Sequence, residues 1–459
     1  MNKFKIILSR QKAYFRTGET KSYQWRVDQL TRMEKMLVEH QQEFFVALNM
    51  DFKTALPEQV FEVHAPLGVI NFTRASLAGW MEPEQVPIPK FLAGSGHSGV
   101  IHRDPYGSVL IIGPFNGPLI TLLNPAIAAL SAGNTVVLKT NENAPATGAL
   151  LEKFVPLYFE AECVAVVSGG KEVVESLLQL PFDFIFFTGS SRVGKIVAKA
   201  AAEKLIPVIL ELGGQNPVII DETADIKDAA RKIAWGATAW GGQWCTSPGY
   251  AYVHRSVAPA FLAEMKNALR EMYGKDPKAN SDLSKMISGE SVNRLMSLID
   301  KRTIVTGGNF DAGHRYLEPT VLYPVQWDDA VMQEELFGPV LPVLEYDELD
   351  TVVNAIQTRP APLAAFIFSK DQSNIDLLTN SLSFGGGAVN QTNIHLFIVT
   401  MPFGGVGDSG IGNYYGRHGY DSLTHAKSML IAPSGVEIEH LLPPYTMEKI
   451  GELNKWFDY

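Results

Sequence analysis

Residues 105–138, PYGSVLIIGPFNGPLITLLNPAIAALSAGNTVVL, contain no charged side chain, and this stretch decides the fold. It is long enough to cross a bilayer, but proline, glycine and asparagine interrupt it repeatedly, and proline breaks the hydrogen bonding of a helix. The better interpretation is a helix over 119–130 between two buried strands, 108–112 and 135–138. Short strands that are apolar throughout are typical of a parallel sheet covered on both faces, so we expect no membrane span.

Outward from this stretch, short apolar runs alternate with helical stretches. In the first half, further strands are expected at 163–167, 182–187 and 208–212, and helices at 146–159, 171–180 and 191–204. After Gly213, strands are expected at 251–253, 320–323, 341–346 and 364–368, and helices at 224–240, 258–273 and 291–301. This alternation predicts a doubly wound parallel sheet followed by a second α/β domain, and such sheets bind ligands at the carboxyl edge of their strands.

The segments outside this alternation have patterns of their own. The N-terminal hundred residues are predicted to be helical, and 22–51 place Leu30, Met33, Met36, Leu37 and Phe44 roughly on one helical face. Residues 82–90 are punctuated by proline and lead into an extended hairpin that leaves the main body. The glycine-rich stretch 403–412 (FGGVGDSGIG) is typical of a loop, and a polar tail closes the sequence.

Composition narrows the class of protein. The 459 residues include 39 Lys and Arg against 49 Asp and Glu, a net charge of −10, which argues against a nucleic-acid partner. Two cysteines exclude a disulfide framework, and the ten histidines have no metal-ligand spacing, so no metal site is expected. The first residues lack the long apolar run and cleavage site of a signal peptide, so we expect a cytoplasmic protein.

A first candidate site is FTGSSRVG, residues 187–194, which follows a strand and opens a helix. Gly189 allows a sharp turn, and the hydroxyl of Ser190 or Ser191 can cap the helix. Val193, Ile196, Val197, Ala200 and Ala201 then recur at helical spacing and predict one packed face. The free N–H groups of such a helix end attract a diphosphate, although an ordinary capped helix explains the motif equally well.

Two further candidates carry reactive groups. Cys245 lies in the polar, glycine-flanked segment GGQWC and is a candidate nucleophile, although a buried, inert cysteine is the more common case. Glu211 lies between two leucines at a strand end, where it is either a paired structural charge or a general base with a raised pKa. By contrast, Cys163 begins an apolar strand and is expected to be a buried, inert thiol.

Together these motifs resemble the aldehyde dehydrogenase superfamily, particularly its shorter, class 3-like bacterial members. The matching segments run in the family's order over nearly the whole chain: GPFN (113–116), KTNE (139–142), FFTGSSRVG (186–194), LELGG (210–214), GGQWC (241–245), EELFGP (334–339) and MPFGGVGDSGIG (401–412). Any one of these segments is weak evidence, but seven in order are specific.

The resemblance implies an α/β fold with two doubly wound parallel-sheet domains and a small bridging hairpin that pairs subunits. The expected domains are a cofactor-binding domain (1–84 and 105–210), a catalytic domain (211–400), bridging strands (85–104 and 424–432), a return segment (401–423) and a C-terminal tail (433–459). It also implies a homodimer that acts on a small-molecule aldehyde, with NAD as cofactor and NADP possible.

The resemblance further assigns roles to residues. Cys245 is the expected nucleophile, Glu211 the base that activates water and Asn116 the oxyanion donor. The expected cofactor-binding residues are Lys139, Glu142, Gly189, Ser190, Val193, Gly194, Glu335 and Phe337, and the expected substrate pocket contains Gly117, Trp244 and Phe403. The implied reaction oxidises the aldehyde to a carboxylic acid through a cysteine thiohemiacetal and thioester. The alternatives are a thioester-forming or ester-hydrolysing relative with the same cysteine, or a catalytically silent binding homologue.

Four positions depart from the family's pattern. Thr140 replaces a proline and Gln215 a lysine, both near the cofactor or the surface. Gly117 replaces an aromatic residue, and Trp244 replaces a small one. We hypothesise a compensating exchange of volume between these last two positions; the alternative is that Trp244 turns into the domain core.

Overall fold

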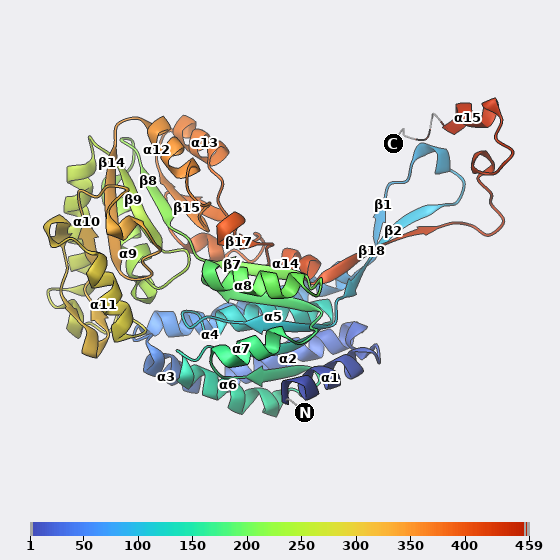
Figure 1. Cartoon of the computed structure of the whole chain (residues 1–459), viewed down its shortest axis with the longest axis horizontal. Helices are drawn as coiled ribbons and strands as arrows, with labels where there is room; N and C mark the ends of the chain where they lie inside the picture. The colour runs from blue at the N-terminus through green and yellow to red at the C-terminus, as the bar shows by residue number, and fades with distance from the viewer. Residues whose placement is uncertain (1–2, 454–455, 457–459) are drawn as a thin grey trace.

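The computed structural model describes residues 3–453 and residue 456 of the chain. Two large sheets, each covered by helices, form the body of the molecule, and a narrow three-stranded arm projects from it (Figure 1). The ends of the predicted segments 1–84 and 433–459 fall partly outside the described residues. Within the described part, no helix is both long and apolar enough to cross a membrane.

Four helices precede the first sheet, as predicted for this region: the first contributes Phe4 and Leu8 to the core on one face of the sheet, and the other three pack on the opposite face (Figure 1). The four helices are α1 (Lys3–Phe15), α2 (Tyr23–Glu39), α3 (Gln41–Asp51) and α4 (Leu56–Met81). The five apolar residues predicted to share one face of 22–51 are all buried. The sequence predicted one helical face over 22–51, but the segment forms two helices, because the chain leaves helical geometry at His40.

The first large sheet has the strand order β17-β7-β6-β3-β4-β5. Its parallel strands are β3 (Ser108–Ile112), β4 (Thr135–Lys139), β5 (Val164–Val167), β6 (Phe184–Gly189) and β7 (Val208–Leu212). The helices between them are α5 (Ile120–Ala132), α6 (Pro145–Tyr158), α7 (Lys171–Leu178) and α8 (Ser191–Ala202). The strands and helices predicted for this half are confirmed, with shifted ends.

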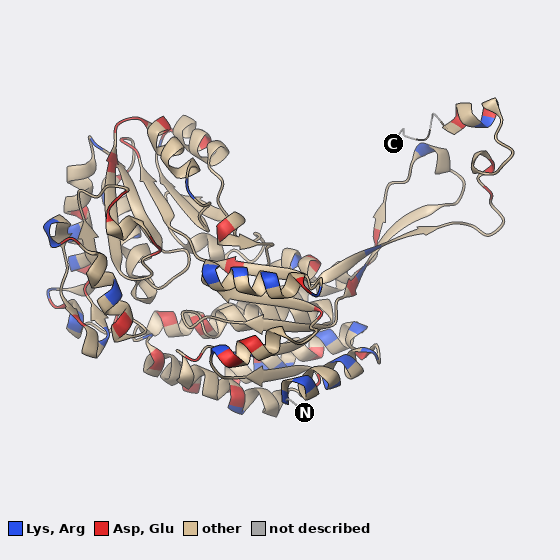
Figure 2. Cartoon of the chain, in the orientation of Figure 1, with Lys and Arg blue, Asp and Glu red and all other residues tan. Residues whose placement is uncertain are grey.

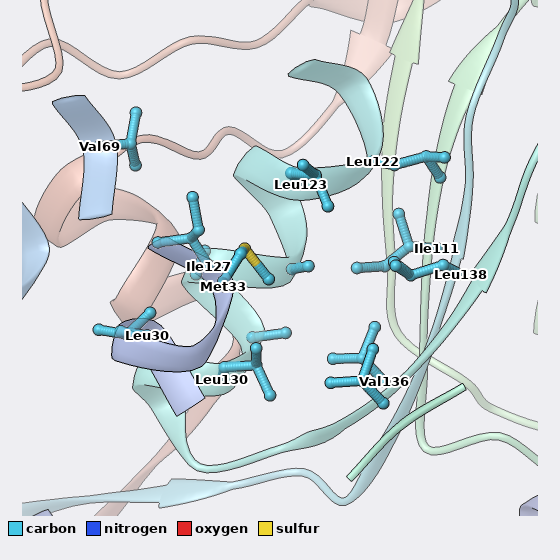
Figure 3. Close-up of a cluster of buried hydrophobic side chains, with 14 of the residues drawn as sticks. Leu30, Met33, Val69, Ile111, Leu122, Leu123, Ile127, Leu130, Val136 and Leu138 are labelled. Atoms are coloured by element: carbon cyan, nitrogen blue, oxygen red, sulfur yellow. The ribbon is translucent and has the colours of Figure 1, made fainter. Parts of the chain in front are cut away.

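The charge-free stretch of the sequence forms β3, α5 and β4 in the centre of this domain. Figure 3 shows Leu122, Leu123, Ile127 and Leu130 of α5 between the strands on one side and the N-terminal helices on the other. Burying a side chain of this size contributes about 1.5–3 kcal/mol. The stretch is therefore a core element, as predicted, and the helices of both layers depend on it.

The glycine-rich stretch 403–412 was expected to be a loop, but it contains a strand. β17 (Gly410–Ile411) pairs antiparallel with β7, and Gly410 lies opposite Glu211. The chain thus returns from the second domain to complete the edge of the first sheet. The expected boundary between residues 210 and 211 falls inside β7, so the first sheet continues two residues further, to Leu212.

The second large sheet has the order β10-β13-β14-β9-β8-β15-β16, parallel except for β10 at one edge. Its strands are β8 (Asn216–Ile220), β9 (Pro248–His254), β10 (Ile304–Thr306), β13 (Thr320–Leu322), β14 (Val340–Tyr346), β15 (Ala364–Phe368) and β16 (Gly386–Val389). Its helices are α9 (Ile226–Thr238), α10 (Ala258–Tyr273), α11 (Gly289–Leu298), α12 (Leu349–Gln357) and α13 (Gln372–Ser381). A separate two-stranded ribbon contains β11 (Phe310–Asp311) and β12 (Tyr316–Leu317).

The projecting arm is an antiparallel sheet of β1 (Glu84–Val86), β2 (Ser98–Pro105) and β18 (Thr424–Ile431). α14 (Gly416–Ser422) connects β17 to β18, and α15 (Met447–Leu453) lies at the far end of the arm (Figure 1). Most of β18 is exposed, including Met429, Leu430 and Ile431. The arm therefore presents apolar surface away from the body.

Candidate active site

A cavity of about 770 Å³ lies between the two large sheets. Its walls come from the carboxyl ends of β3, β4, β6 and β7 in the first domain and from loops of the second. All but one of the predicted site residues line it: Asn116, Gly117, Lys139, Glu142, Gly189, Ser190, Val193, Glu211, Trp244, Cys245, Glu335, Phe337 and Phe403. The fold thus brings together side chains up to 287 positions apart, from Asn116 to Phe403.

The first helix of interest, α8, opens at the cavity. Ser190 caps it, since its hydroxyl accepts a hydrogen bond from the backbone N–H of Val193 at 3.5 Å. Gly194 is the predicted residue that does not line the cavity. A Cβ there would lie 2.5 Å from Leu212 Cδ2, so this glycine lets α8 pack closely on β7. Ile196 was expected to pack inward, but it is 52% exposed and faces the cavity.

Charged side chains lie mainly on the outer helices, and α8 carries Arg192, Lys195 and Lys199 (Figure 2). Arg192 also lines the cavity. Opposite, at the end of β4, the Lys139 ammonium lies 3.0 Å from Glu142 Oε2. Basic groups and a helix N-terminus therefore flank this end of the cavity and favour an anionic ligand.

The loop that carries Cys245 has an unusual backbone. Trp240, Gly241 and Gly242 all have positive φ, at 57°, 62° and 67°. The Gln243 side chain donates to the Trp240 carbonyl at 3.0 Å and fixes this turn. Glycine adopts positive φ readily, but Trp240 does so at a cost, so the surrounding structure must hold this residue.

Asn216 anchors the same loop from below. Its amide nitrogen donates to the carbonyls of Cys245 and Ser247 at 2.8 and 2.9 Å, and its oxygen accepts from the N–H of Ala364. The side chain is 1% exposed, so these bonds are shielded from water. Asn216 was not predicted from the sequence; its position directly after LELGGQ was the available signal.

The electrostatics of the thiol follow from its surroundings. Burial and the nearby carboxylates of Glu211 and Glu335 raise the pKa of Cys245 to about 12. Without a bound ligand the group is therefore a thiol at neutral pH rather than a thiolate. Cys163 is buried and free, and its raised pKa fits the inert role expected for it.

Glu211 is a buried carboxyl group without an ionic partner among the described residues. Neither of its oxygens accepts a hydrogen bond there, and burial raises its pKa well above the usual range. The choice left open by the sequence is thereby decided: it is not a paired structural charge. A buried carboxyl group with a raised pKa is the kind of group that serves as a general base.

Glu335 is the third titratable group. Burial raises its pKa to about 7, while the N–H of Gly214 donates to Oε1 at 3.3 Å and opposes that rise. Phe337 follows it in a left-handed conformation, with φ 53°. The loop therefore turns both side chains toward the cavity, which they line.

The side of the cavity near Cys245 is aromatic. Trp244 packs on Trp240 with ring centroids 4.0 Å apart, and it also contacts Trp235 and Phe397. It is 8% exposed yet lines the cavity, so it belongs both to the core and to the pocket wall. The exchange of volume with Gly117 stays a prediction.

Thr140 and Gln215, the other two positions that depart from the family's pattern, do not line the cavity. Thr140 Oγ1 is 2.8 Å from Ser168 Oγ, and Gln215 donates to the carbonyls of Met332 and Glu334. Thr140 therefore makes a side-chain hydrogen bond that a proline cannot make.

Comparison with known proteins agrees with this geometry. The profile of the aldehyde dehydrogenase family matches residues 3–429. The chain is 40% identical over 437 residues to the 4,4'-diaponeurosporen-aldehyde dehydrogenase of Staphylococcus aureus, covering 95% of each chain. The chain belongs to the aldehyde dehydrogenase family.

Two further comparisons extend this result. The family member named aldehyde dehydrogenase, dimeric NADP-preferring, of Canis lupus familiaris is 35% identical over 434 residues, covering 94% of this chain and 95% of that one. The solved structure described as the substrate-bound state of Staphylococcus aureus AldH superposes with a TM-score of 0.97 at 39% identity over all of both chains.

This aldehyde dehydrogenase oxidises an aldehyde to a carboxylic acid with NAD or NADP, which confirms the predicted fold, reaction and cofactor class. Membership of this family also favours the acid-forming reaction over the three alternatives, which were a thioester-forming relative, an ester-hydrolysing relative and a catalytically silent homologue.

Sequence reasoning missed several residues around the site. Tyr414 and Tyr415 are buried and line the cavity near Glu211 and Cys245, and burial is the main cause of the raised pKa of each phenol. Their signal was the pair of aromatic residues directly after the glycine-rich motif. Glu62, from α4, also lines the cavity, and it was not noticed because its helix lies far from the motifs in sequence.

Proposed function

We propose that Cys245 attacks the aldehyde carbonyl while Asn116 and the Cys245 backbone N–H hold the oxyanion. The observation that carries this is the meeting of Asn116, Glu211 and Cys245 in one cavity, with an uncompensated, buried carboxyl group beside the thiol. Preorganised donors of this kind contribute about 3–4 kcal/mol each to the transition state.

The Cys245 thiol loses its proton to solvent, its sulfur forms a bond to the carbonyl carbon, and the carbonyl electron pair moves to oxygen, giving the oxyanion of a thiohemiacetal. When bound, NAD or NADP supplies the hydride acceptor. Loss of the hydride from the carbonyl carbon leaves a thioester on Cys245. Glu211 then takes a proton from water, the hydroxide adds to the thioester carbon, and the carbon–sulfur bond breaks to release the acid and a thiolate, which takes the proton from Glu211 and restores both groups.

The chain's residues fit such a cofactor. We propose that the diphosphate binds at the N-terminus of α8, where Gly189, Ser190 and Val193 lie, and that a flat ring lies between α7 and α8. The hydroxyl of Thr188 is buried beside this site and has no hydrogen-bond partner in the described part of the chain, so it can bind a ligand. Lys139 and Glu142 are proposed to hold the adenosine ribose.

Glu335 and Phe337 are proposed to hold the nicotinamide ribose and ring. The Glu142 carboxylate would repel a 2′-phosphate, which supports NAD as the preferred cofactor. The substrate is proposed to be an apolar aldehyde, because Trp244, Phe397 and Phe403 line the pocket. An aldehyde panel assayed separately with NAD and NADP tests both preferences.

We also propose a homodimer and a cytoplasmic location. The exposed apolar residues of β18 support the homodimer, since an arm of this kind is expected to bury them against a second copy. The dog relative is named as dimeric. Both described cysteines are free, as a catalytic thiol in a reducing compartment requires. Light scattering of the purified protein measures the first proposal directly.

Two variants test the mechanism. Cys245→Ala should abolish oxidation while leaving cofactor binding intact, because the nucleophile and the diphosphate site lie on separate elements; turnover above about a thousandth of wild type contradicts the covalent route. Glu211→Gln should give one burst of reduced cofactor per site and then stall at the thioester. Loss of the burst itself would show that Glu211 acts earlier and would make Glu335 the rival base.

A further inference from the structure

Three charged side chains that the mechanism does not use lie inside the fold beside the cavity. Lys53, Glu58 and Glu62 are each at most 7% exposed, and we call them the buried charge cluster. Lys53 Nζ lies 2.9 Å from Glu62 Oε1 and 4.2 Å from the ring centroid of Trp240. Charges are costly to bury, so a cluster of three requires an explanation.

Glu62 holds the start of α5. Its Oε2 accepts hydrogen bonds from the backbone N–H groups of Leu119 and Ile120, both at 3.0 Å. These residues follow Asn116 by three and four positions. A Cβ at Gly117 would lie 3.5 Å from Glu62 Oε1, so the carboxylate lies directly against the turn that carries Asn116.

Glu58 holds the other loop. Its Oε1 accepts from the backbone N–H of Trp240 at 2.7 Å, and its Oε2 accepts from Ser284 Oγ at 2.6 Å. Trp240 is the first of the three left-handed residues before Cys245. One carboxylate of the cluster is therefore bonded to the loop of the proposed oxyanion donor and the other to the loop of the proposed nucleophile.

Lys53 contacts both the Glu62 carboxylate and the ring of Trp240. Glu58 and Glu62 are four positions apart on α4, where like charges repel, and both attract the Lys53 ammonium. We propose that the buried charge cluster is a positioning device that fixes Asn116 relative to Cys245: Glu62 and Glu58, held at a fixed spacing on α4, each bind one loop by hydrogen bonds, and Lys53 balances their charge. The proposal rests on the proposed roles of Asn116 and Cys245.

The decisive comparison uses two double variants with the same net charge as wild type. Lys53→Met with Glu62→Gln keeps an oxygen that can accept from Leu119 and Ile120, whereas Lys53→Met with Glu62→Ala removes it. We expect a burst of reduced cofactor near the wild-type rate in the first. In the second the burst should be about 10- to 100-fold slower, since a misplacement of about 1 Å costs on the order of 100-fold. Equal burst rates in the two variants would overturn the proposal.

A second readout separates positioning from general damage. Alkylation of Cys245 by iodoacetamide displaces iodide and develops no oxyanion, so it does not depend on Asn116. In the Lys53→Met, Glu62→Ala variant we expect the alkylation rate to stay within about threefold of wild type while the burst slows. If alkylation and burst slow by the same factor, the cluster is merely structural and the proposal is wrong.

Asp51→Asn is the matched control. Asp51 is a buried carboxylate on the neighbouring helix, and it accepts bonds from Ala146 and Thr147 at the start of α6 rather than from either catalytic loop. It should lower the melting temperature without slowing the burst. A burst slowed as much as in the alanine variant would overturn the proposal.

Removing Asn116 distinguishes failure of the inference from failure of the mechanism. In an Asn116→Ala background, loss of the cluster should slow the burst no further, because the group that it positions is gone. A full additional loss there would overturn the inference alone. An unchanged burst in Asn116→Ala itself would refute the proposed oxyanion donor instead.

Discussion

Replacing Gly242 by alanine should damage the active site far more than one methyl group suggests. A Cβ at this position would lie 2.2 Å from the carbonyl carbon of Gly338 and 2.5 Å from the nitrogen of Pro339, both of them backbone atoms. Ordinary contact begins at 3.4 Å, so the two loops must move apart by a further 1.2 Å. One loop carries Cys245 and the other follows Glu335, so the displacement falls directly between proposed catalytic groups.

The cost has two parts. A side chain at positive φ costs about 1–2 kcal/mol, and overpacking a close contact typically costs about 1–3 kcal/mol more. We therefore expect Gly242→Ala to be about 2–5 kcal/mol less stable than wild type. We also expect kcat/KM about 100-fold lower, since a misplacement of this size costs about that much in rate.

Gly18→Ala is the control for backbone strain alone. Gly18 also has a positive φ, 83°, but nothing lies within 4 Å of the Cβ that would be added. This variant should lose about 1–2 kcal/mol and keep full activity. Urea denaturation and steady-state kinetics of the two variants measure both quantities. If Gly242→Ala behaves like Gly18→Ala in both assays, the close approach of the two loops is not required for catalysis.

Three further predictions concern the titratable groups and the pocket. Glu211→Gln should stabilise the protein at pH 7–8, because burial raises the pKa of this carboxyl group in the folded state and the native enzyme therefore loses stability as pH rises above the unfolded-state pKa. In thermal melts, the extra stability of the variant should vanish near pH 4. Glu335→Gln should speed iodoacetamide alkylation of Cys245 at pH 8, because removing a nearby negative charge lowers the thiol pKa; an unchanged rate would contradict this coupling. Gly117→Tyr and Trp244→Thr should each lower kcat/KM, and the double variant should recover part of the loss with a coupling of about 0.5–3 kcal/mol, whereas additive effects on aliphatic and aromatic aldehydes would refute the exchange of volume.

The sequence was informative about the fold wherever burial alone determined structure. β3, β7 and β15 have the predicted bounds because each is an apolar run ended by glycine or a polar residue. β8 (Asn216–Ile220) escaped prediction because Pro217 interrupts its pattern, and β17 is too short to leave a periodic signal. Both strands form because they pair with strands distant in sequence, and no local sequence pattern reports that pairing.

The residues of the candidate active site were likewise predictable only in part. The proposed catalytic residues Cys245, Glu211 and Asn116 lie in recognisable motifs, so their meeting in one cavity could be anticipated from the resemblance. The buried charge cluster could not, because its three members become meaningful only when α3 and α4 pack beneath two distant loops. Its one local signal is the pair Glu58 and Glu62, which are the only acidic residues of α4 and lie one helical turn apart.

The pairing of β17 with β7 has a consequence for how the polypeptide is made. Until residue 410 leaves the ribosome, the strand that bears Glu211 is the bare edge of a nearly finished sheet, with unpaired N–H and C=O groups. Bare edges recruit other chains, and domains begin to fold during synthesis. The nascent first domain is therefore exposed to aggregation for as long as the second takes to emerge, and the strand of the proposed catalytic base is covered only when β17 (Gly410–Ile411) returns to pair with it.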